Sequence, residues 1–214
     1  MTERIRTAIV FGKGRVAVRA TQLLLSESYE ILFVVPSPSH HTGDLSFANW
    51  ASRQGLKVRP ATRLDDLDLP PADLGISTYF DLIFRQRHID KFHLLANVHN
   101  SLLPKYRGVR PINWALKNGD SHHGVTLHQI TTGIDEGPIL AQEAFSIDPS
   151  VDEVRDVYGR CLTAAEILLE TSLPRIWHLV PIPQEGGHAS HHSATDDEDL
   201  GNRRFWTRTD TQLL

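Results

Sequence analysis

Residues 97–142 read NVHNSLLPKYRGVRPINWALKNGDSHHGVTLHQITTGIDEGPILAQ, and this stretch decides the fold class and the place of the site. It holds an amide, an imidazole and a carboxylate in order, at Asn97, His99 and Asp135. These groups are suited to catalysed acyl transfer. The apolar residues 94–96 predict a strand that leads into the stretch, so Asn97 and His99, one residue apart, point to the same face. We therefore expect one site at the end of this strand.

Segments with strand and helix patterns alternate up to this point. The strand-like runs lie at residues 5–11, 31–35, 74–78 and 94–99, and the helix-like segments lie at residues 16–25, 47–53 and 85–91. Alternation of this kind predicts an α/β fold with a mostly parallel sheet flanked by helices.

A helix, two strands and a long helix follow. Pro111 opens the first helix, and Asn118 with Gly119 closes it. We expect strands at residues 124–130 and 138–145, and a helix at residues 151–177 that Pro181 and Pro183 stop. The pattern predicts a main domain at residues 1–180 and a polar C-terminal extension at residues 181–214 that docks or dimerises.

Composition and charge favour a small-molecule partner. A chain of 214 residues with 40% apolar content predicts one globular domain. The formal charge of −4 provides no field that attracts polyanions, so we expect neither nucleic acid nor a membrane as a partner. The N-terminus resembles no signal peptide, and we expect a cytoplasmic protein. The single Cys161 lies in an apolar helical pattern and is interpreted as a core residue.

The motifs of residues 97–137 resemble those of the folate-dependent formyltransferases. That family's pattern is Asn-x-His-x-Ser-Leu-Leu-Pro-x-Tyr-Arg-Gly, then Gly-Val-Thr, then Ile-Asp-x-Gly, and it is found here at residues 97–108, 124–126 and 134–137. The resemblance implies a Rossmann-like catalytic domain and 10-formyltetrahydrofolate as the formyl donor. It also implies that Asn97, His99 and Asp135 are catalytic and that the formyl group passes directly to an amine. No metal is predicted, because the histidines of the chain match no metal-site pattern.

The three residues suit this chemistry. An amide N–H and an imidazole stabilise the negative charge that develops on the formyl oxygen, and loss of one such donor typically costs ~3 kcal/mol. A carboxylate beside His99 is expected to raise its pKa and fix its orientation. Gly133 and Gly137 flank Asp135 and are expected to allow a tight loop. A structural histidine and a loop-capping aspartate are the alternatives.

The resemblance and the expected strand ends also place the substrates. We expect the pterin ring of the donor to contact Phe80, Asp81, Leu82, Ile83, Ile130, Thr131, Gly133 and Ile134. We expect the acceptor to contact Gly12, Lys13, Ser101, Tyr106, Arg107 and Arg110, because arginine pairs well with phosphate or carboxylate. Solvated loop charges are the alternative for the two arginines.

Ser101 and the turn at residues 12–14 each have a second interpretation. Ser101 could be a nucleophile, but no elbow pattern surrounds it, and a local hydrogen bond that holds the turn is favoured. Gly12, Lys13 and Gly14 could begin a dinucleotide fingerprint, yet residues 36–41 supply no acidic residue for a ribose, so nicotinamide binding is disfavoured.

The acceptor is predicted to be a nucleotide-linked amino sugar. Methionyl-tRNA formyltransferases typically append a tRNA-binding domain, for which this chain is too short. Glycinamide ribonucleotide formyltransferases usually lack the Tyr-Arg-Gly-x-x-Pro continuation present at residues 106–111. A silent folate- or nucleotide-binding module is an alternative of another class, and loss of a catalytic residue would favour it.

The C-terminal histidines and aromatic residues remain open to two interpretations each. His188, His191 and His192 suggest a metal site, but no HExxH pattern or cysteine partner accompanies them, so a solvated loop is expected. Phe205 and Trp206 are interpreted as a docking contact rather than a stacking platform.

Overall fold

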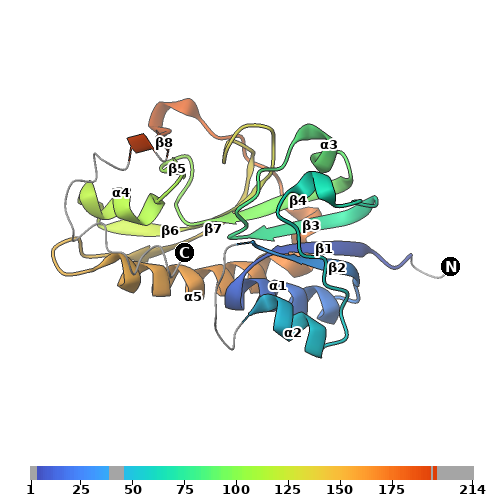
Figure 1. Ribbon diagram of the computed structural model, residues 1–214. Helices are drawn as coiled ribbons and strands as arrows, with labels where there is room; N and C mark the ends of the chain where they lie inside the picture. The colour runs from blue at the N-terminus through green and yellow to red at the C-terminus, as the bar shows by residue number, and fades with distance from the viewer. Residues whose placement is uncertain (1–3, 39–45, 194, 197–214) are drawn as a thin grey trace.

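The molecule is a six-stranded sheet with helices on its faces (Figure 1). The computed structural model describes residues 4–38, 46–193 and 195–196. The strand order is β2-β1-β3-β4-β6-β7. The first four strands in this order are parallel, and β6 and β7 are antiparallel to their neighbours. Their bounds are β1 Thr7–Gly12, β2 Glu30–Pro36, β3 Ala72–Thr78, β4 Phe92–His99, β6 His122–Gln129 and β7 Ile139–Ser146. The prediction of a Rossmann-like, mostly parallel sheet is confirmed.

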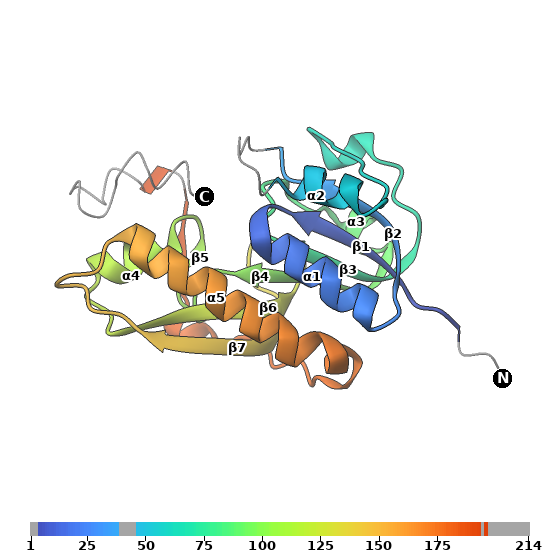
Figure 2. The same ribbon diagram turned by 90° about the horizontal axis from the view of Figure 1, so that it is seen from below.

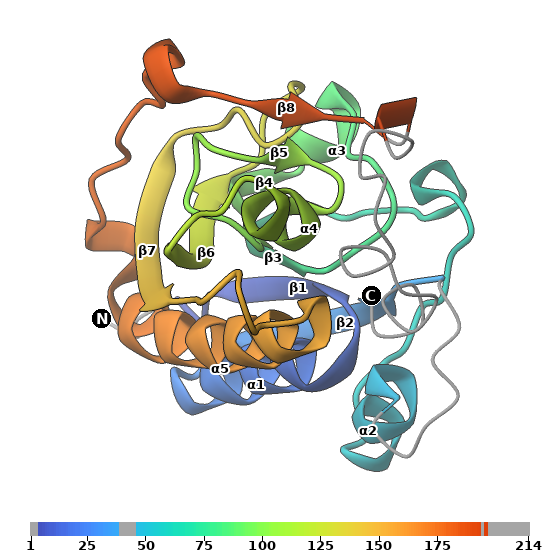
Figure 3. The same ribbon diagram turned by 90° about the vertical axis from the view of Figure 1, so that its left-hand side faces the viewer.

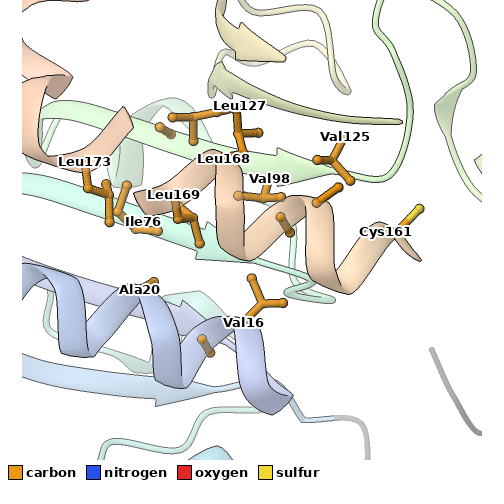
Figure 4. Packing of buried hydrophobic residues seen from close by; sticks show 14 of the residues in the cluster. Val16, Ala20, Ile76, Val98, Val125, Leu127, Cys161, Leu168, Leu169 and Leu173 are labelled. Carbon is orange, nitrogen blue, oxygen red and sulfur yellow. The ribbon is translucent and has the colours of Figure 1, made fainter. Parts of the chain in front are cut away.

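Two helices, α1 (Gly14–Ser26) and α5 (Val154–Ser172), lie side by side on one face of the sheet (Figure 2). Their buried residues meet the sheet side chains Ile76, Val98 and Leu127 in the main core (Figure 4). Burial of each such side chain contributes roughly 1.5–3 kcal/mol. Cys161 is fully buried in α5 and belongs to this core, as its pattern predicted.

The opposite face of the sheet carries a second cluster and the polar residues of the motifs. Alternation along β1 sends Ala8 and Val10 to the main core and Ile9 and Phe11 to the second cluster. In β4, Val98 faces α5, so Asn97 and His99 on either side of it face away from that helix. The site therefore lies on the face that α1 and α5 leave uncovered.

Three shorter helices of the described residues lie in the connections between the strands. They are α2 (Phe47–Arg53), α3 (Gln86–Ile89) and α4 (Pro111–Lys117), with short 3₁₀ segments at Leu64–Asp66, Leu173–His178 and Gly186–His188. Two of these helices, α2 and α4, contribute buried residues to the main core. The long C-terminal helix is α-helical only to Ser172, because Pro174, which lacks an N–H, opens a 3₁₀ segment. No helix in the part of the chain that the structure describes is long and apolar enough to cross a membrane.

A small second sheet joins the C-terminal segment to the motif loop. β8 (His191–His192) runs parallel to β5 (Arg107–Gly108), and Figure 3 shows it crossing beside that loop. The His192 ring stacks on Trp114, with centroids 3.9 Å apart and planes at 11°. The expectation of a solvated loop is therefore wrong for residues 191–192, because backbone pairing and ring stacking hold them. Phe205 and Trp206 lie outside the described residues.

Candidate active site

A pocket of about 580 Å³ opens where β3 and β4 end, and Asn97, His99 and Asp135 all line it. The chain passes from β1 to β2 on one side of β1 and then returns to β3 on its other side. The strand order therefore reverses between β1 and β3, and the pocket lies at this switch point of the parallel sheet. Ligands of open α/β sheets bind at this place. Lys13, which follows β1, and Tyr79, which follows β3, form part of its wall.

A row of three polar side chains crosses the sheet floor. The strand register pairs Asn97 with Ser77 on β3 and with His128 on β6. The Ser77 hydroxyl donates to Asn97 Oδ1 at 2.8 Å, and Asn97 Nδ2 lies 3.2 Å from His128 Nε2. The amide of Asn97 is thus held from both sides.

His99 is the last residue of β4, and both of its ring nitrogens have neighbours. Nε2 lies 2.8 Å from the main-chain oxygen of Tyr106, which can only accept, so Nε2 carries the hydrogen. Nδ1 lies 3.4 Å from Asp135 Oδ2. Burial lowers the pKa of His99 by more than the charge of Asp135 raises it. Asp135 thus raises the pKa of His99 as expected, but burial has the larger effect, and the pKa is lowered overall.

Asp135 occupies the tip of the loop between β6 and β7. Its Oδ2 accepts a hydrogen bond from Gly108 N at 2.9 Å, and its Oδ1 lies 3.4 Å from His128 Nε2. Burial raises the pKa of Asp135, but the two imidazoles and the Gly108 N–H outweigh burial and hold that pKa well below its usual range. Asp135 is therefore ionised at neutral pH.

The loop geometry differs from the expectation in one respect. Asp135 itself takes the left-handed conformation, at φ 54°, whereas neither Gly133 nor Gly137 has a positive φ. Gly137 is needed for space, because a Cβ there would lie 1.8 Å from Gln129 O. An aspartate tolerates this backbone better than most residues, since its short polar side chain bonds locally.

The C-terminal segment supports this loop through Gln184. The Gln184 side chain donates to the main-chain oxygens of Asp135 and Gly137, both at 2.7 Å, and accepts from Arg107 Nε at 2.9 Å. Arg107 also lies 3.6 Å from Glu136. Arg107, predicted as an acceptor contact, does not line the pocket, because these contacts turn its side chain towards the loop.

Four further predicted acceptor residues, Gly12, Ser101, Tyr106 and Arg110, do not line the pocket. Ser101 is fully buried, and its hydroxyl donates to Lys105 O at 2.6 Å, so it holds the turn. The Tyr106 hydroxyl donates to Asp120 at 2.9 Å. Gly12 serves a close approach, because a Cβ there would meet Thr78 O at 2.3 Å. Arg110 precedes α4 with a left-handed backbone, at φ 56°.

The predicted donor-side residues come together as a group. The segments after β3 and after β6 form one wall of the pocket, and all of the predicted donor contacts belong to it: Phe80, Asp81, Leu82, Ile83, Ile130, Thr131, Gly133 and Ile134. Ile83 and Ile134 are exposed, at 69% and 47%. Exposed apolar side chains in a pocket favour binding of a flat ring.

Lys13 stands apart from the other predicted acceptor residues, because it lines the pocket. Its Nζ lies 3.1 Å from Asp81 Oδ1, and this ion pair joins the turn after β1 to the donor wall. The pocket also contains residues that no sequence argument singled out for it, namely Ser77, Tyr79, His128, Tyr158 and the C-terminal residues 191–193.

The fold and the site define an enzyme class, the α/β formyl-transfer enzymes. The family model described as "Formyl transferase" matches residues 10–173, and the chain belongs to the formyl transferase family. The resemblance drawn from the motifs is confirmed.

Solved structures agree with this assignment. One is WlaRD, a sugar 3N-formyl transferase with dTDP and 5-N-formyl-THF, at 28% identity and TM-score 0.80, covering 90% of this chain and 71% of that one. Another is an N-formyltransferase from Helicobacter canadensis with folinic acid and dTDP-3-aminofucose, at 28% identity and TM-score 0.77, with coverages of 90% and 72%. PseJ from Anoxybacillus kamchatkensis matches at 25% identity and TM-score 0.67, with coverages of 97% and 95%.

Proposed function

We propose that this enzyme moves the formyl group of 10-formyltetrahydrofolate to the amine of a nucleotide-linked amino sugar. The observation that carries the proposal is the meeting of Asn97, His99 and Asp135 in one pocket whose other wall is apolar. The similar structures named above contain a formylated or unformylated folate together with dTDP or a nucleotide sugar, which supports both substrates.

The pterin of the donor fits the wall formed by residues 80–84 and 130–135. Its apolar members pack against a flat ring, and main-chain groups of the two loops hydrogen-bond its edge. The formyl group then points towards the end of β4, where Asn97 and His99 lie.

His99 acts as the base that takes a proton from the attacking amine. Nε2 donates to Tyr106 O, so Nδ1, which lies 3.4 Å from Asp135 Oδ2, is the ring nitrogen that receives the proton, and burial lowers the pKa of His99 so that Nδ1 starts unprotonated. Asp135 stabilises the imidazolium that forms 3.4 Å away. Asn97 donates an N–H to the oxygen that becomes negative as the amine adds to the formyl carbon. When this adduct collapses, the bond between the formyl carbon and N10 of the folate breaks, and the proton that His99 took passes to N10, so that tetrahydrofolate leaves.

Transfer is direct in this proposal, because the two candidate nucleophiles are occupied elsewhere. The Ser101 hydroxyl is buried against Lys105 O, and the Cys161 thiol lies in the core, where burial raises its pKa. Initial-rate lines that intersect when both substrates are varied are expected, and parallel lines would contradict direct transfer.

The acceptor enters beside Lys13, Tyr79 and Tyr158, which line the same pocket as the donor wall. A phosphate-bearing substrate has a handle remote from its amine, and such handles align the reacting groups. Glycinamide ribonucleotide is also an amine with a remote phosphate, so the same argument applies to it. Methionyl-tRNA would instead show steep loss of binding with salt.

The test is a panel of dTDP- and UDP-linked amino sugars, glycinamide ribonucleotide and methionyl-tRNA, each incubated with 10-formyltetrahydrofolate and analysed for an added formyl mass. We expect an amino-sugar nucleotide to give the highest kcat/KM. Equal or better use of either other acceptor would contradict the proposed acceptor, and His99→Ala should abolish whichever transfer is found.

A further inference from the structure

We infer that His128 is a positioning residue that holds the Asn97 amide with one N–H directed into the pocket. The inference rests on the proposed role of Asn97 as a donor to the developing negative charge. His128 on one side and Ser77 on the other give this amide one orientation.

The sheet register brings the three residues into a row. Ser77, Asn97 and His128 are neighbours across β3, β4 and β6, and all three line the pocket. Ser77 and His128 are each 2% exposed, so water does not compete for their contacts with the amide. A donor fixed by buried partners needs no reorientation when charge develops beside it.

The donor and acceptor roles in this row can be assigned one after the other, from Gln129 to His128 and then to Asn97. The main-chain oxygen of Gln129 can only accept, and it lies 2.9 Å from His128 Nδ1, which therefore carries the hydrogen. Nε2 is then the ring nitrogen that can accept. It lies 3.2 Å from Asn97 Nδ2, which can only donate, while Asn97 Oδ1 accepts from the Ser77 hydroxyl at 2.8 Å.

A reversed amide would place two acceptors, Asn97 Oδ1 and His128 Nε2, against each other. The orientation with Oδ1 towards Ser77 and Nδ2 towards His128 therefore gives a hydrogen-bond partner to the Ser77 hydroxyl, to both polar atoms of the Asn97 amide and to His128 Nε2. Asn97 Nδ2 has two hydrogens, and within the described residues only one of them has a partner, at His128. The second is available to a substrate oxygen in the pocket.

His128 has a second neighbour, because its Nε2 lies 3.4 Å from Asp135 Oδ1. A bond to Asp135 requires a hydrogen on Nε2 and would end the bond from Asn97. The contact with Asn97 is the shorter of the two and favours action through Asn97, and the experiment separates the two routes.

The matched pair is His128→Gln and His128→Leu. The Gln carbonyl oxygen reaches the place of Nε2 and can accept from Asn97, whereas Leu cannot. We expect His128→Leu to lower kcat by about 30-fold with the donor KM nearly unchanged, and His128→Gln to stay within about 5-fold of wild type. His123→Leu is the control, because His123 is equally buried on β6 and does not contact Asn97.

A double-mutant comparison identifies the partner. In an Asn97→Ala background, His128→Leu should cause no more than about a 2-fold further loss, whereas in an Asp135→Asn background it should cause the full loss. Equal losses with and without Asn97, or wild-type kcat in His128→Leu, would overturn the inference.

A structural readout is independent of the acceptor. A neutron-diffraction structure, in which the amide hydrogens distinguish Nδ2 from Oδ1, should show the Asn97 amide of His128→Leu turned or in two orientations, and that of His128→Gln unchanged. An unchanged amide in His128→Leu would overturn the inference even if no acceptor were formylated. Absence of formyl transfer by the wild-type enzyme would instead contradict the proposed function alone.

Discussion

The Gln184 side chain donates a 2.7 Å hydrogen bond to the main-chain oxygen of Asp135, across 49 positions of the sequence. It donates a second to Gly137 O and accepts from Arg107. One amide thus joins the C-terminal segment, the motif loop and the loop that carries the carboxylate. The segment beyond residue 180, predicted as an extension, contributes to the geometry of the site.

Gln184→Leu should lower kcat by about 10-fold or more, because a carboxylate displaced by a fraction of an ångström no longer supports His99. The melting temperature should change little. Steady-state kinetics with both substrates measure the effect, with Glu185→Gln, an exposed neighbour, as the control. Full activity in Gln184→Leu would show that the loop holds its shape alone.

Asp135→Asn should reduce kcat by about 100-fold or more while the protein keeps its fold. Asparagine adopts the left-handed backbone that Asp135 uses, at φ 54°, so the change removes the charge and preserves the loop. Single-turnover rates and a thermal melt measure the two effects separately. A rate above about a third of wild type would remove Asp135 from the mechanism.

Gly108→Ala and Gly119→Ala form a matched pair. Both glycines have positive φ, at 85° and 73°, but a Cβ at Gly108 would lie 2.1 Å from His192 O, whereas at Gly119 nothing lies within 4 Å. Gly119→Ala should cost about 1–2 kcal/mol with full activity. Gly108→Ala should cost more and lower kcat, because β8 and the bond to Asp135 must shift. Urea unfolding measures the loss of stability, and steady-state kinetics measure the loss of kcat. Equal losses in the two variants would contradict a steric clash between a Cβ at position 108 and His192 O.

Stability should fall as the pH is lowered from 7 to 5, in part because of His123. Burial lowers the pKa of His123 to about 4, against 6.5 when unfolded. Between these two pKa values the unfolded chain binds more protons than the folded one, so lowering the pH from 7 to 5 reduces the free energy of unfolding by about 2 kcal/mol. The full contribution of His123 is present above pH 6.5. His123→Phe should flatten the dependence of the unfolding free energy on pH, and His122→Gln, at an exposed position, should not.

The sequence predicted the sheet and the three central residues, because strand periodicity and local motifs determine both. Asn97 and His99 lie together through alternation along one strand. His128 was not predicted, since its importance comes from the register between β4 and β6, which no local pattern specifies. Arg107 and Tyr106 have residue types suited to a ligand, and only the tertiary contacts show that their side chains bind the protein itself, Arg107 at Gln184 and Tyr106 at Asp120.

Residues 184–192 are synthesised after the strands and helices whose loops they hold. The core of the sheet, α1 and α5 needs none of these residues, so it can form first, while the loops at Arg107 and Asp135 await partners that arrive later. The core is therefore expected to fold before the loops at Arg107 and Asp135 take their final conformation. During refolding, secondary structure should return before catalytic competence does, and the delay measures the docking of the C-terminal segment.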